Sequence, residues 1–207
     1  MIDANEKRHV ATCDIVGAYL HADMKEKVHM MIRDKMVDML VAANKIKYSK
    51  HVHITKKGGN ILYTLLGKAL YGCLKSARLF WEHVKEVLKR LCFVLNRYDS
   101  CVANKKIEGS QCTITWHVDD LKISHHDIKA VEEVILTIEE VYGKMTVTHG
   151  NRYEYVGMDF EYLRNKRAVQ FCMKHHLEEA LQDFTGNITI KVNTPTAVHL
   201  FVVDEEC

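Results

Sequence analysis

The spacing of apolar and polar residues predicts a chain in which strands and helices alternate. Two stretches, 76–91 and 127–142, have apolar residues three and four positions apart, which is the period of an amphipathic helix. Other stretches alternate apolar and polar residues with a period of two, as a strand does when one of its faces is buried. The predicted strands cover residues 8–16, 27–32, 51–56, 61–66, 101–106, 111–118, 121–125, 145–148, 154–162 and 167–173, and two shorter helices cover 33–44 and 174–184.

The helix at 33–44 has an apolar face, which we expect to pack into the core. The residues of this face are Met36, Met39, Leu40 and Ala43. Ser76 and Asp127 lie at the start of the two long helices and are predicted to cap them, because their side-chain oxygens can accept a hydrogen bond from a backbone N–H. Gly143 is predicted to end the second long helix, since glycine adopts a left-handed conformation without strain.

The order of the predicted elements indicates the fold class. The middle of the chain runs strand, helix, strand, strand, helix, strand, which is the split βαβ or ferredoxin-like order of an α+β protein. Short hairpins flank this unit and a C-terminal helix follows it. We expect one domain over residues 1–186 and a loosely held tail at 187–207, which contains the one proline, Pro195, and ends in acidic residues.

Composition narrows the class of protein only slightly. The chain of 207 residues has 29 basic and 27 acidic residues, so no strongly basic tail indicates a nucleic-acid binder, although a local stripe of lysines can coexist with a net charge of +2. The seven cysteines have no C-x-x-C spacing, and we interpret them as free thiols in a reducing compartment. The sequence shows no signal peptide and no apolar run of membrane-spanning length, so we expect a soluble, intracellular, cytoplasmic protein.

The chemistry of the chain is predicted to centre on Asp119 and Asp120, which lie between two alternating runs without a neighbouring Gly or Pro. Asp is depleted in strands, so the pair indicates either a tight turn with solvated carboxylates or a functional site. Asp14 ends another predicted strand, and the ferredoxin-like order would bring it beside this pair. Three such carboxylates would repel one another by roughly 4 kcal/mol per pair at ~4 Å, and a bound divalent cation would relieve the repulsion. Because oxygen ligands suit Mg²⁺ better than zinc, we predict Asp14, Asp119 and Asp120 as magnesium ligands.

Five short blocks, in the same order, resemble the blocks of copia-type LTR-retrotransposon reverse transcriptases. Each block has a recognisable core: the aspartate of the first, an "ALYG" run in the second, the aspartate pair, a "VG" that is similar to "FLG", and a closing "TP". The blocks occupy residues 14–23, 69–81, 116–121, 153–158 and 193–195. Together they cover about residues 8–196, and their order makes the resemblance specific.

The resemblance implies the palm of a right-hand polymerase that acts as an RNA-directed DNA polymerase. By analogy with the family, Asp14 and Asp119 would hold two Mg²⁺ or Mn²⁺ ions and Asp120 would complete the acidic cluster. The implied partners are an RNA or DNA template-primer, deoxynucleoside triphosphates and other parts of a retrotransposon polyprotein, with no membrane involved. In the parent element the place of action would be a virus-like particle.

The family pattern also suggests roles for five further residues. Tyr19 matches a ring that excludes a ribose 2′-hydroxyl, and the alternative is a core aromatic at a turn. Gly72 would let backbone approach the nucleotide or template, and the alternative is a glycine at a helix entry. His117, where the family usually has Tyr, Tyr155 and Gly157 would contact the primer end, and the alternative for the last two is an ordinary strand pair.

Two departures keep other functions open. Lys75-Ser76-Ala77 stands where the family usually has Gln-Ser-Pro, and only 13 residues precede Asp14, which leaves no room for the fingers of the family. We therefore expect a fragment of a polyprotein with weak or absent primer extension. One alternative is a truncated non-catalytic relic that acts at most as a folded interaction module. Another is a metal-dependent phosphodiesterase or nucleotide cyclase on the same core, which would not explain the second, fourth and fifth blocks.

Overall fold

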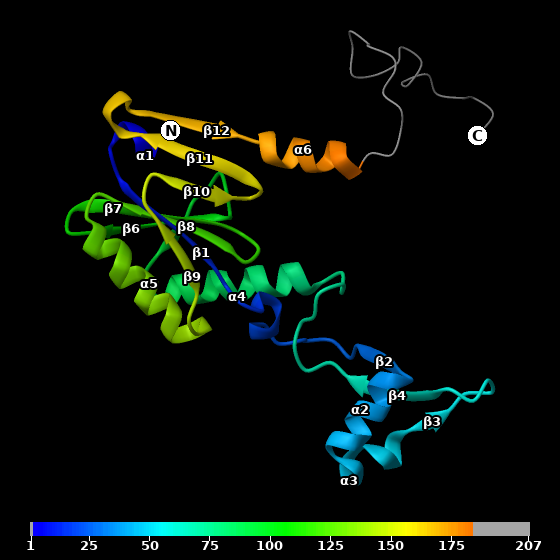
Figure 1. The fold of residues 1–207 in the computed structure, drawn as a ribbon. Helices are drawn as coiled ribbons and strands as arrows, with labels where there is room; N and C mark the ends of the chain where they lie inside the picture. The colour runs from blue at the N-terminus through cyan, green and yellow to red at the C-terminus, as the bar shows by residue number, and fades with distance from the viewer. Residues whose placement is uncertain (1, 184–207) are drawn as a thin grey trace, which may run out of the picture. The chain divides into compact units, whose positions relative to one another are not determined.

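A computed structural model describes residues 2–183 of the chain (Figure 1). The chain divides into two compact units, Met1–Cys172 and Met173–Cys207. In the second unit the described part is the helix α6, Lys174–Asp183. The predicted tail at 187–207 and the fifth block at 193–195 lie outside the described residues.

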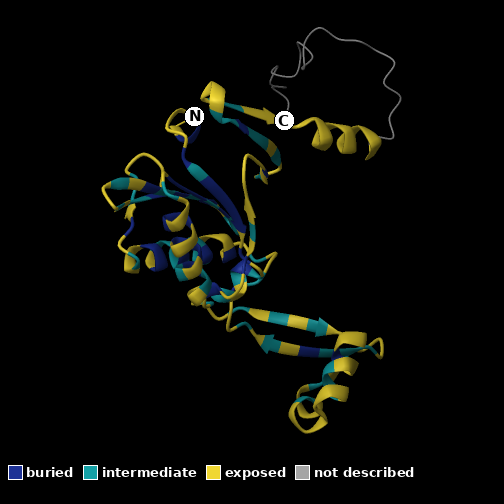
Figure 2. Cartoon of the chain, turned by 60° about the vertical axis from the view of Figure 1, so that its left-hand side comes forward, coloured by how far each residue is buried: buried dark blue, intermediate teal, exposed yellow. Residues whose placement is uncertain are grey.

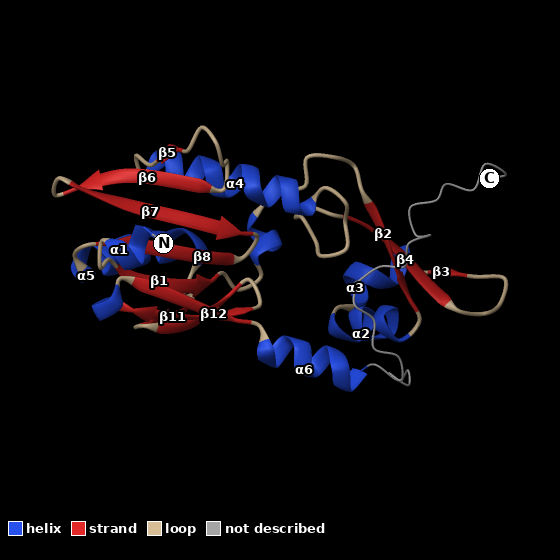
Figure 3. Ribbon diagram, turned by 90° about the horizontal axis from the view of Figure 1, so that it is seen from above, coloured by secondary structure: helices blue, strands red, loops and turns tan. Residues whose placement is uncertain are grey.

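The first unit is built around a six-stranded sheet, called here the main sheet. Its strand order is β5-β6-β7-β8-β1-β9, with every neighbouring pair antiparallel. Figure 3 shows β5, β6, β7, β8 and β1 side by side in this order. The strands are β1 His9–Asp14, β5 Val94–Leu95, β6 Val102–Ile107, β7 Ser110–His117, β8 Asp120–His125 and β9 Thr146–His149. The predicted mixture of helices and antiparallel strands is thus present.

Two long helices, α4 Ser76–Arg90 and α5 Ile128–Tyr142, cover one face of the main sheet (Figure 1). Their apolar stripes follow the predicted period, and the buried members pack with the sheet into one core. The helix residues in this core include Phe80, Val84, Val87, Leu88, Val131, Val134, Ile135 and Ile138. Burying each large apolar side chain contributes about 1.5–3 kcal/mol, so this layer is the main source of stability.

A smaller sheet lies over the opposite face of the main sheet. It has the order β10-β11-β12, and it packs through Tyr153 and Tyr162 against Val10 of β1 and Ala4 of the short helix α1. The elements of this layer are α1 Ile2–Asn5, β10 Arg152–Tyr155, β11 Met158–Leu163, the 3₁₀ turn η3 Arg164–Lys166 and β12 Ala168–Cys172. The predicted single strand at 154–162 is wrong, because Val156 and Gly157 both have positive φ (53° and 69°) and form a turn there.

A third group of elements, residues 27–68, is called here the β2–β4 module. Its sheet has the order β2-β4-β3, and the helix α2 packs on it through Val37, which is fully buried. The elements are β2 His29–Arg33, α2 Lys35–Ala43, α3 Lys45–Tyr48, η2 Ser49–His51, β3 His53–Ile54 and β4 Asn60–Leu65, and the 3₁₀ turn η1 Ala18–His21 precedes them. The predicted Gly-Gly hairpin is present between β3 and β4.

Two expectations about side chains are wrong. Met36 and Met39 are 63 % and 66 % exposed, because α2 buries Val37 rather than the methionine stripe. Ser76 is buried but does not cap α4, since its hydroxyl donates to the Leu70 carbonyl (2.7 Å) and accepts from the Leu70 N–H (3.1 Å). Asp127 caps α5 as predicted, accepting from the Lys129 N–H at 2.9 Å. Among the described residues, no helix has both the length and the apolar character that a membrane crossing requires.

A buried ionic network attaches α1 to the main sheet. Asp3 is 7 % exposed and pairs with Lys122 of β8 at 2.5 Å, while the Tyr162 hydroxyl donates to the same carboxylate at 3.3 Å. Burial alone would raise the pKa of Asp3, but the charges of Lys122 and Arg8 and the hydrogen bonds of Lys122 and Ser124 lower it below its usual value. The ionised form of Asp3 therefore stabilises the folded chain.

We expect Asp3→Asn to lower the free energy of unfolding by about 3 kcal/mol at pH 7, since it leaves the Lys122 charge buried without its partner. The folded-state pKa of Asp3 is depressed, so its stabilisation is present above about pH 4 and is lost as the pH falls through the folded pKa. Urea unfolding at pH 7 and pH 3 measures both effects. The exposed control Glu140→Gln is expected to change little at either pH, and an equal loss in both variants would contradict the role of the network.

Candidate active site

The register of β1 and β8 brings the predicted carboxylates together. Asp14 lies directly opposite Asp120 in the antiparallel ladder, and the Ile15 N–H donates to the Asp119 carbonyl at 3.0 Å. Because side chains alternate between the faces of a sheet, Asp14 and Asp120 point away from the helices, toward the face that also carries the smaller sheet. All three predicted acidic residues are thus neighbours at one end of the two strands.

The turn between β7 and β8 has an unusual backbone. His117 pairs with Asp120, so Val118 and Asp119 alone connect the two strands. Val118 has φ +54°, which is an outlier for a β-branched residue and occurs here in a position that glycine usually takes in a two-residue hairpin. Such strain is found where the surrounding structure needs a particular geometry, and here it positions Asp119 beside the end of β1.

The electrostatics of the site follow from this proximity. Asp14 is exposed, whereas Asp119 and Asp120 are half-buried. Burial raises the pKa of Asp120, and the charges of Asp119, Asp14 and Glu154 raise it further, while His117 opposes them. The neighbouring carboxylates are therefore close enough to destabilise the ionised form of Asp120.

The donor set suits a hard divalent cation, but the side chains do not form a preassembled cage. All the acidic donors are carboxylate oxygens, the ligands that Mg²⁺ prefers, and their mutual repulsion is what a cation would relieve. Within residues 2–183, however, no three His, Cys, Asp or Glu side chains converge closely enough to ligate one ion. The fit therefore comes from the backbone register and the chemistry of the donors.

The second sequence block contributes a contact that sequence reasoning did not find. The Tyr71 hydroxyl donates to Asp119 Oδ2 at 3.4 Å, and the Tyr71 ring lies on the Tyr19 ring with centroids 4.3 Å apart. Tyr19 also meets Phe80 of the core edge-on at 6.1 Å. Gly72 follows at φ +90°, a conformation that favours glycine, and so it shapes the loop that presents Tyr71. Tyr71 is the tyrosine of the "ALYG" run in the second block, but the block pattern alone assigned it no role at the site.

A pocket of about 280 Å³ adjoins the acidic residues. Besides Asp14 and Asp120 it is lined by the predicted primer-contacting residues Tyr155 and Gly157, and by Glu154, which sequence reasoning missed. The other lining residues are Thr12, Cys13, Thr146, Thr148 and Val156. The turn between β10 and β11 therefore lies beside the carboxylates of Asp14 and Asp120. His117 is exposed and lies opposite Asp120 in the β7–β8 ladder.

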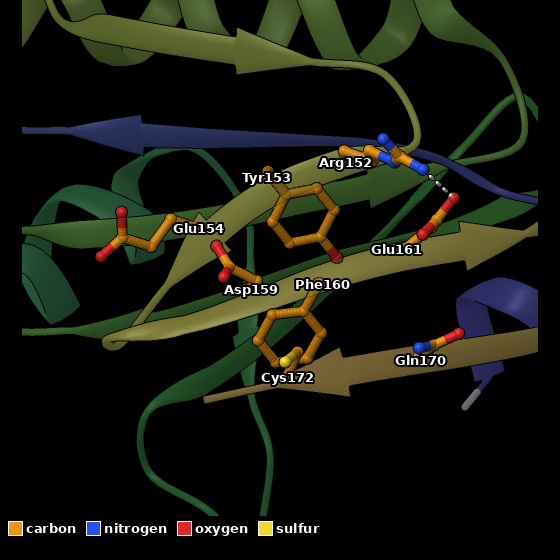
Figure 4. A pocket seen from close by; sticks show the side chains of 8 residues that line it. All are labelled: Arg152, Tyr153, Glu154, Asp159, Phe160, Glu161, Gln170 and Cys172. Carbon is orange, nitrogen blue, oxygen red and sulfur yellow. Dashed lines mark hydrogen bonds and ion pairs between the residues drawn. The ribbon is translucent and has the colours of Figure 1, made fainter. Parts of the chain in front are cut away.

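A larger hollow, of about 350 Å³, lies on the smaller sheet (Figure 4). The rings of Tyr153 and Phe160 stack there with centroids 5.5 Å apart, and Arg152 pairs with Glu161 at 2.8 Å. It shares only Glu154 with the acidic pocket. Because one of its carboxylates is already neutralised by an arginine, it is the weaker candidate for metal chemistry.

Comparison with known proteins identifies the class. Residues 1–198 match the family model described as "Reverse transcriptase (RNA-dependent DNA polymerase)", so the chain belongs to this family. The resemblance to copia-type retrotransposon enzymes is confirmed by two relatives from Saccharomyces cerevisiae, the Transposon Ty1-DR1 Gag-Pol polyprotein and the Truncated transposon Ty1-A Gag-Pol polyprotein. Each is 26 % identical over 191 residues, which is 89 % of this chain but only 9 % and 14 % of the relatives' lengths.

Solved structures give a partial likeness. Apo telomerase from Candida tropicalis has a TM-score of 0.43 and 14 % identity, covering 79 % of this chain and 32 % of that one. Telomerase from Candida albicans in complex with a telomeric RNA fragment has a TM-score of 0.42 and 13 % identity, covering 82 % and 33 %. At these TM-scores the assignment to the family depends on the sequence match alone.

We expect Asp120→Asn to raise the free energy of unfolding at pH 7 in EDTA by up to about 1 kcal/mol, a modest gain because solvent screens the half-buried group. The folded-state pKa of Asp120 is raised, so its ionised form destabilises the fold at neutral pH, and the difference disappears as the pH falls through that pKa. Chemical unfolding from pH 7 to pH 3 measures this. The control Asp159→Asn, at an exposed carboxylate, should change nothing, and a parent chain more stable than Asp120→Asn at pH 7 would contradict the repulsion.

Proposed function

We propose that the chain is the palm region of an RNA-directed DNA polymerase, which transfers nucleotides to a primer 3′-hydroxyl. The observation that carries the proposal is the ladder that sets Asp14 opposite Asp120 with Asp119 adjacent. The order β9-β1-β8-β7 within the main sheet, with α4 and α5 on one face, supports a ferredoxin-like palm. We extend the proposed palm region to residue 186, as the sequence pattern suggests.

The proposed catalytic residues are Asp14, Asp119 and Asp120, with the first two as the principal metal ligands. Two Mg²⁺ or Mn²⁺ ions, when bound, supply the charge that activates the primer hydroxyl and stabilises the leaving pyrophosphate. Tyr71 acts as a positioning residue, because its hydroxyl holds Asp119 Oδ2. Such chemistry depends mostly on positioning and charge, so loss of one carboxylate should be severe.

The proposed binding residues surround this centre. Tyr19, fixed against Tyr71 and Phe80, is proposed to exclude a ribose 2′-hydroxyl, and Gly72 to allow backbone to approach the nucleotide. His117, Tyr155 and Gly157 are proposed to contact the primer end, since the last two line the pocket that contains Asp14 and Asp120. The substrates would be deoxynucleoside triphosphates and an RNA or DNA template-primer. The Gag-Pol relatives suggest that other parts of a polyprotein are partners.

A second candidate is a folded, non-catalytic interaction module. It is favoured by the lack of three converging ligand side chains within residues 2–183. Under this alternative Asp119 and Asp120 would be solvated residues of a tight turn without a catalytic role. The two experiments below separate the candidates.

We expect Asp14→Asn and Asp119→Asn each to weaken Mn²⁺ binding at least tenfold, because each removes a charged oxygen donor from the cluster. Calorimetric titration of the apo chain with MnCl₂, without nucleotide, measures the affinity directly. Asp159→Asn, outside the cluster, serves as the matched control. If the parent chain and both variants bind Mn²⁺ equally, the metal site is excluded.

We expect the chain to extend a DNA primer on a poly(rA) template only weakly in the presence of Mn²⁺, and Asp119→Asn to lower this rate by at least 10²–10³-fold, as for loss of a main electrostatic stabiliser. Gel analysis of a labelled primer gives the rate constants. Asp159→Asn should extend at the parental rate. No extension by the parent above the Asp119→Asn background would refute catalysis by this chain and favour the interaction module.

A further inference from the structure

A pocket of different chemistry lies at the end of the smaller sheet that is remote from the carboxylates. It has a volume of about 790 Å³, is called here the η3 pocket, and is formed by the end of β9, the link to β10, and the turn η3 between β11 and β12. Figure 2 shows this turn at the outer end of the smaller sheet, where it is mostly exposed. The η3 pocket shares no lining residue with the pocket that contains Asp14 and Asp120. Its one residue from β9 is His149, which faces Glu132 of α5 at 3.6 Å.

The charges of the η3 pocket do not cancel. The one carboxylate among its described lining residues is Glu161, which pairs with Arg152 at 2.8 Å. Arg164 and Lys166 also line the pocket, and neither has a carboxylate partner within residues 2–183. The pocket therefore carries a surplus of two positive charges.

Arg164 is oriented by a neutral partner. Its Nε donates to Asn151 Oδ1 at 2.6 Å, and Asn151 is itself anchored to β11, because its carbonyl accepts from the Tyr162 N–H at 2.7 Å. An amide oxygen cancels no charge, and this bond leaves the two terminal nitrogens of the guanidinium for a ligand. Burial lowers the pKa of His9, and the charge of Arg164 lowers it further, as an uncompensated cation would.

We propose that the η3 pocket binds a small molecule through a phosphate monoester group. Such a group carries a charge of about −1.5 to −2 at pH 7, which matches the two surplus cations of the pocket. The planar fork of Arg164 can hold two of its oxygens at once, while Lys166 supplies the second charge. The volume lies within the range of about 300–1,000 Å³ that is typical of small-molecule pockets, so the rest of the ligand also has room.

A carboxylate or a phosphodiester matches this pocket less well, because each carries a single negative charge. The backbone of a nucleic acid presents only diesters, so it would leave one of the two cations without a partner. The inference does not rest on the proposed function, since the η3 pocket contains none of the proposed catalytic residues and its ligand needs no metal.

The test is calorimetric titration of the full chain with phenyl phosphate at pH 7 in EDTA. We expect Arg164→Gln and Lys166→Gln each to weaken binding at least about tenfold, as for loss of a charge-assisted hydrogen bond. Arg97→Gln is the matched control, because Arg97 is an exposed arginine outside the pocket. Circular dichroism checks that each variant is folded. Lys166 is exposed, so its variant tests the pocket even if the half-buried Arg164 is needed for folding.

The charge of the ligand gives a second readout that does not depend on a variant. The methyl diester of phenyl phosphate keeps the ring but carries one negative charge, and we expect it to bind at least about tenfold more weakly. Equal binding of monoester and diester would overturn the proposal, as would no binding by the parent chain or unchanged binding by both variants. Displacement of phenyl phosphate by an oligothymidylate without a terminal phosphate would also overturn it. Because the titration contains no metal, its result is independent of the Mn²⁺ titration that tests the carboxylate site.

Discussion

The pairing of β1 with β8 is the constraint on which the candidate site depends. A sheet side chain has a period of two, so a slip of one residue in this ladder would move Asp14 to the helix side and bury it in the core. Packing on the helix side fixes this register, because Cys13 and Leu121 on that side are only 2 % and 1 % exposed. Apolar packing on one face therefore holds together, on the opposite face, carboxylates that would otherwise separate.

The two acidic centres on the outer face of β8 differ in how their charge is balanced. Lys122 meets Asp3 at 2.5 Å, so both charges of that pair are neutralised, and the pKa of Asp3 falls. Two positions earlier on the same face, Asp120 has Asp14 and Asp119 as neighbours, and its pKa rises. The first arrangement stabilises the folded chain and the second destabilises it. A group of carboxylates that destabilises the fold, held in place by the strained Val118 turn, is typical of a functional site rather than of residues that only pack the fold.

Much of the fold could be predicted because the strongest patterns are local. The two long helices, the Asp127 cap and the proximity of Asp14 to the aspartate pair all follow from apolar period and element order. The buried side of α2 could not be predicted, since an amphipathic pattern shows which residues share a face but not which face meets a sheet. Tyr71 and Glu154 were missed for a related reason. Both lie inside blocks that the sequence makes visible, but each reaches the site through tertiary contacts, which the order and spacing of the blocks do not specify.

The net charge of the chain says little about which ligands its surface can bind. A net charge of +2 describes the field far from a molecule, but at physiological salt a charge acts over only about 8 Å. Over that distance the β7–β8 turn presents carboxylates, whereas the β2–β4 module presents mostly cations. A ligand near either region therefore experiences the local charge and not the net charge of the chain. A cation held by the acidic residues would have to be in direct contact with their oxygens, which requires exact backbone register. Near-neutral composition is therefore compatible with two surfaces of opposite charge.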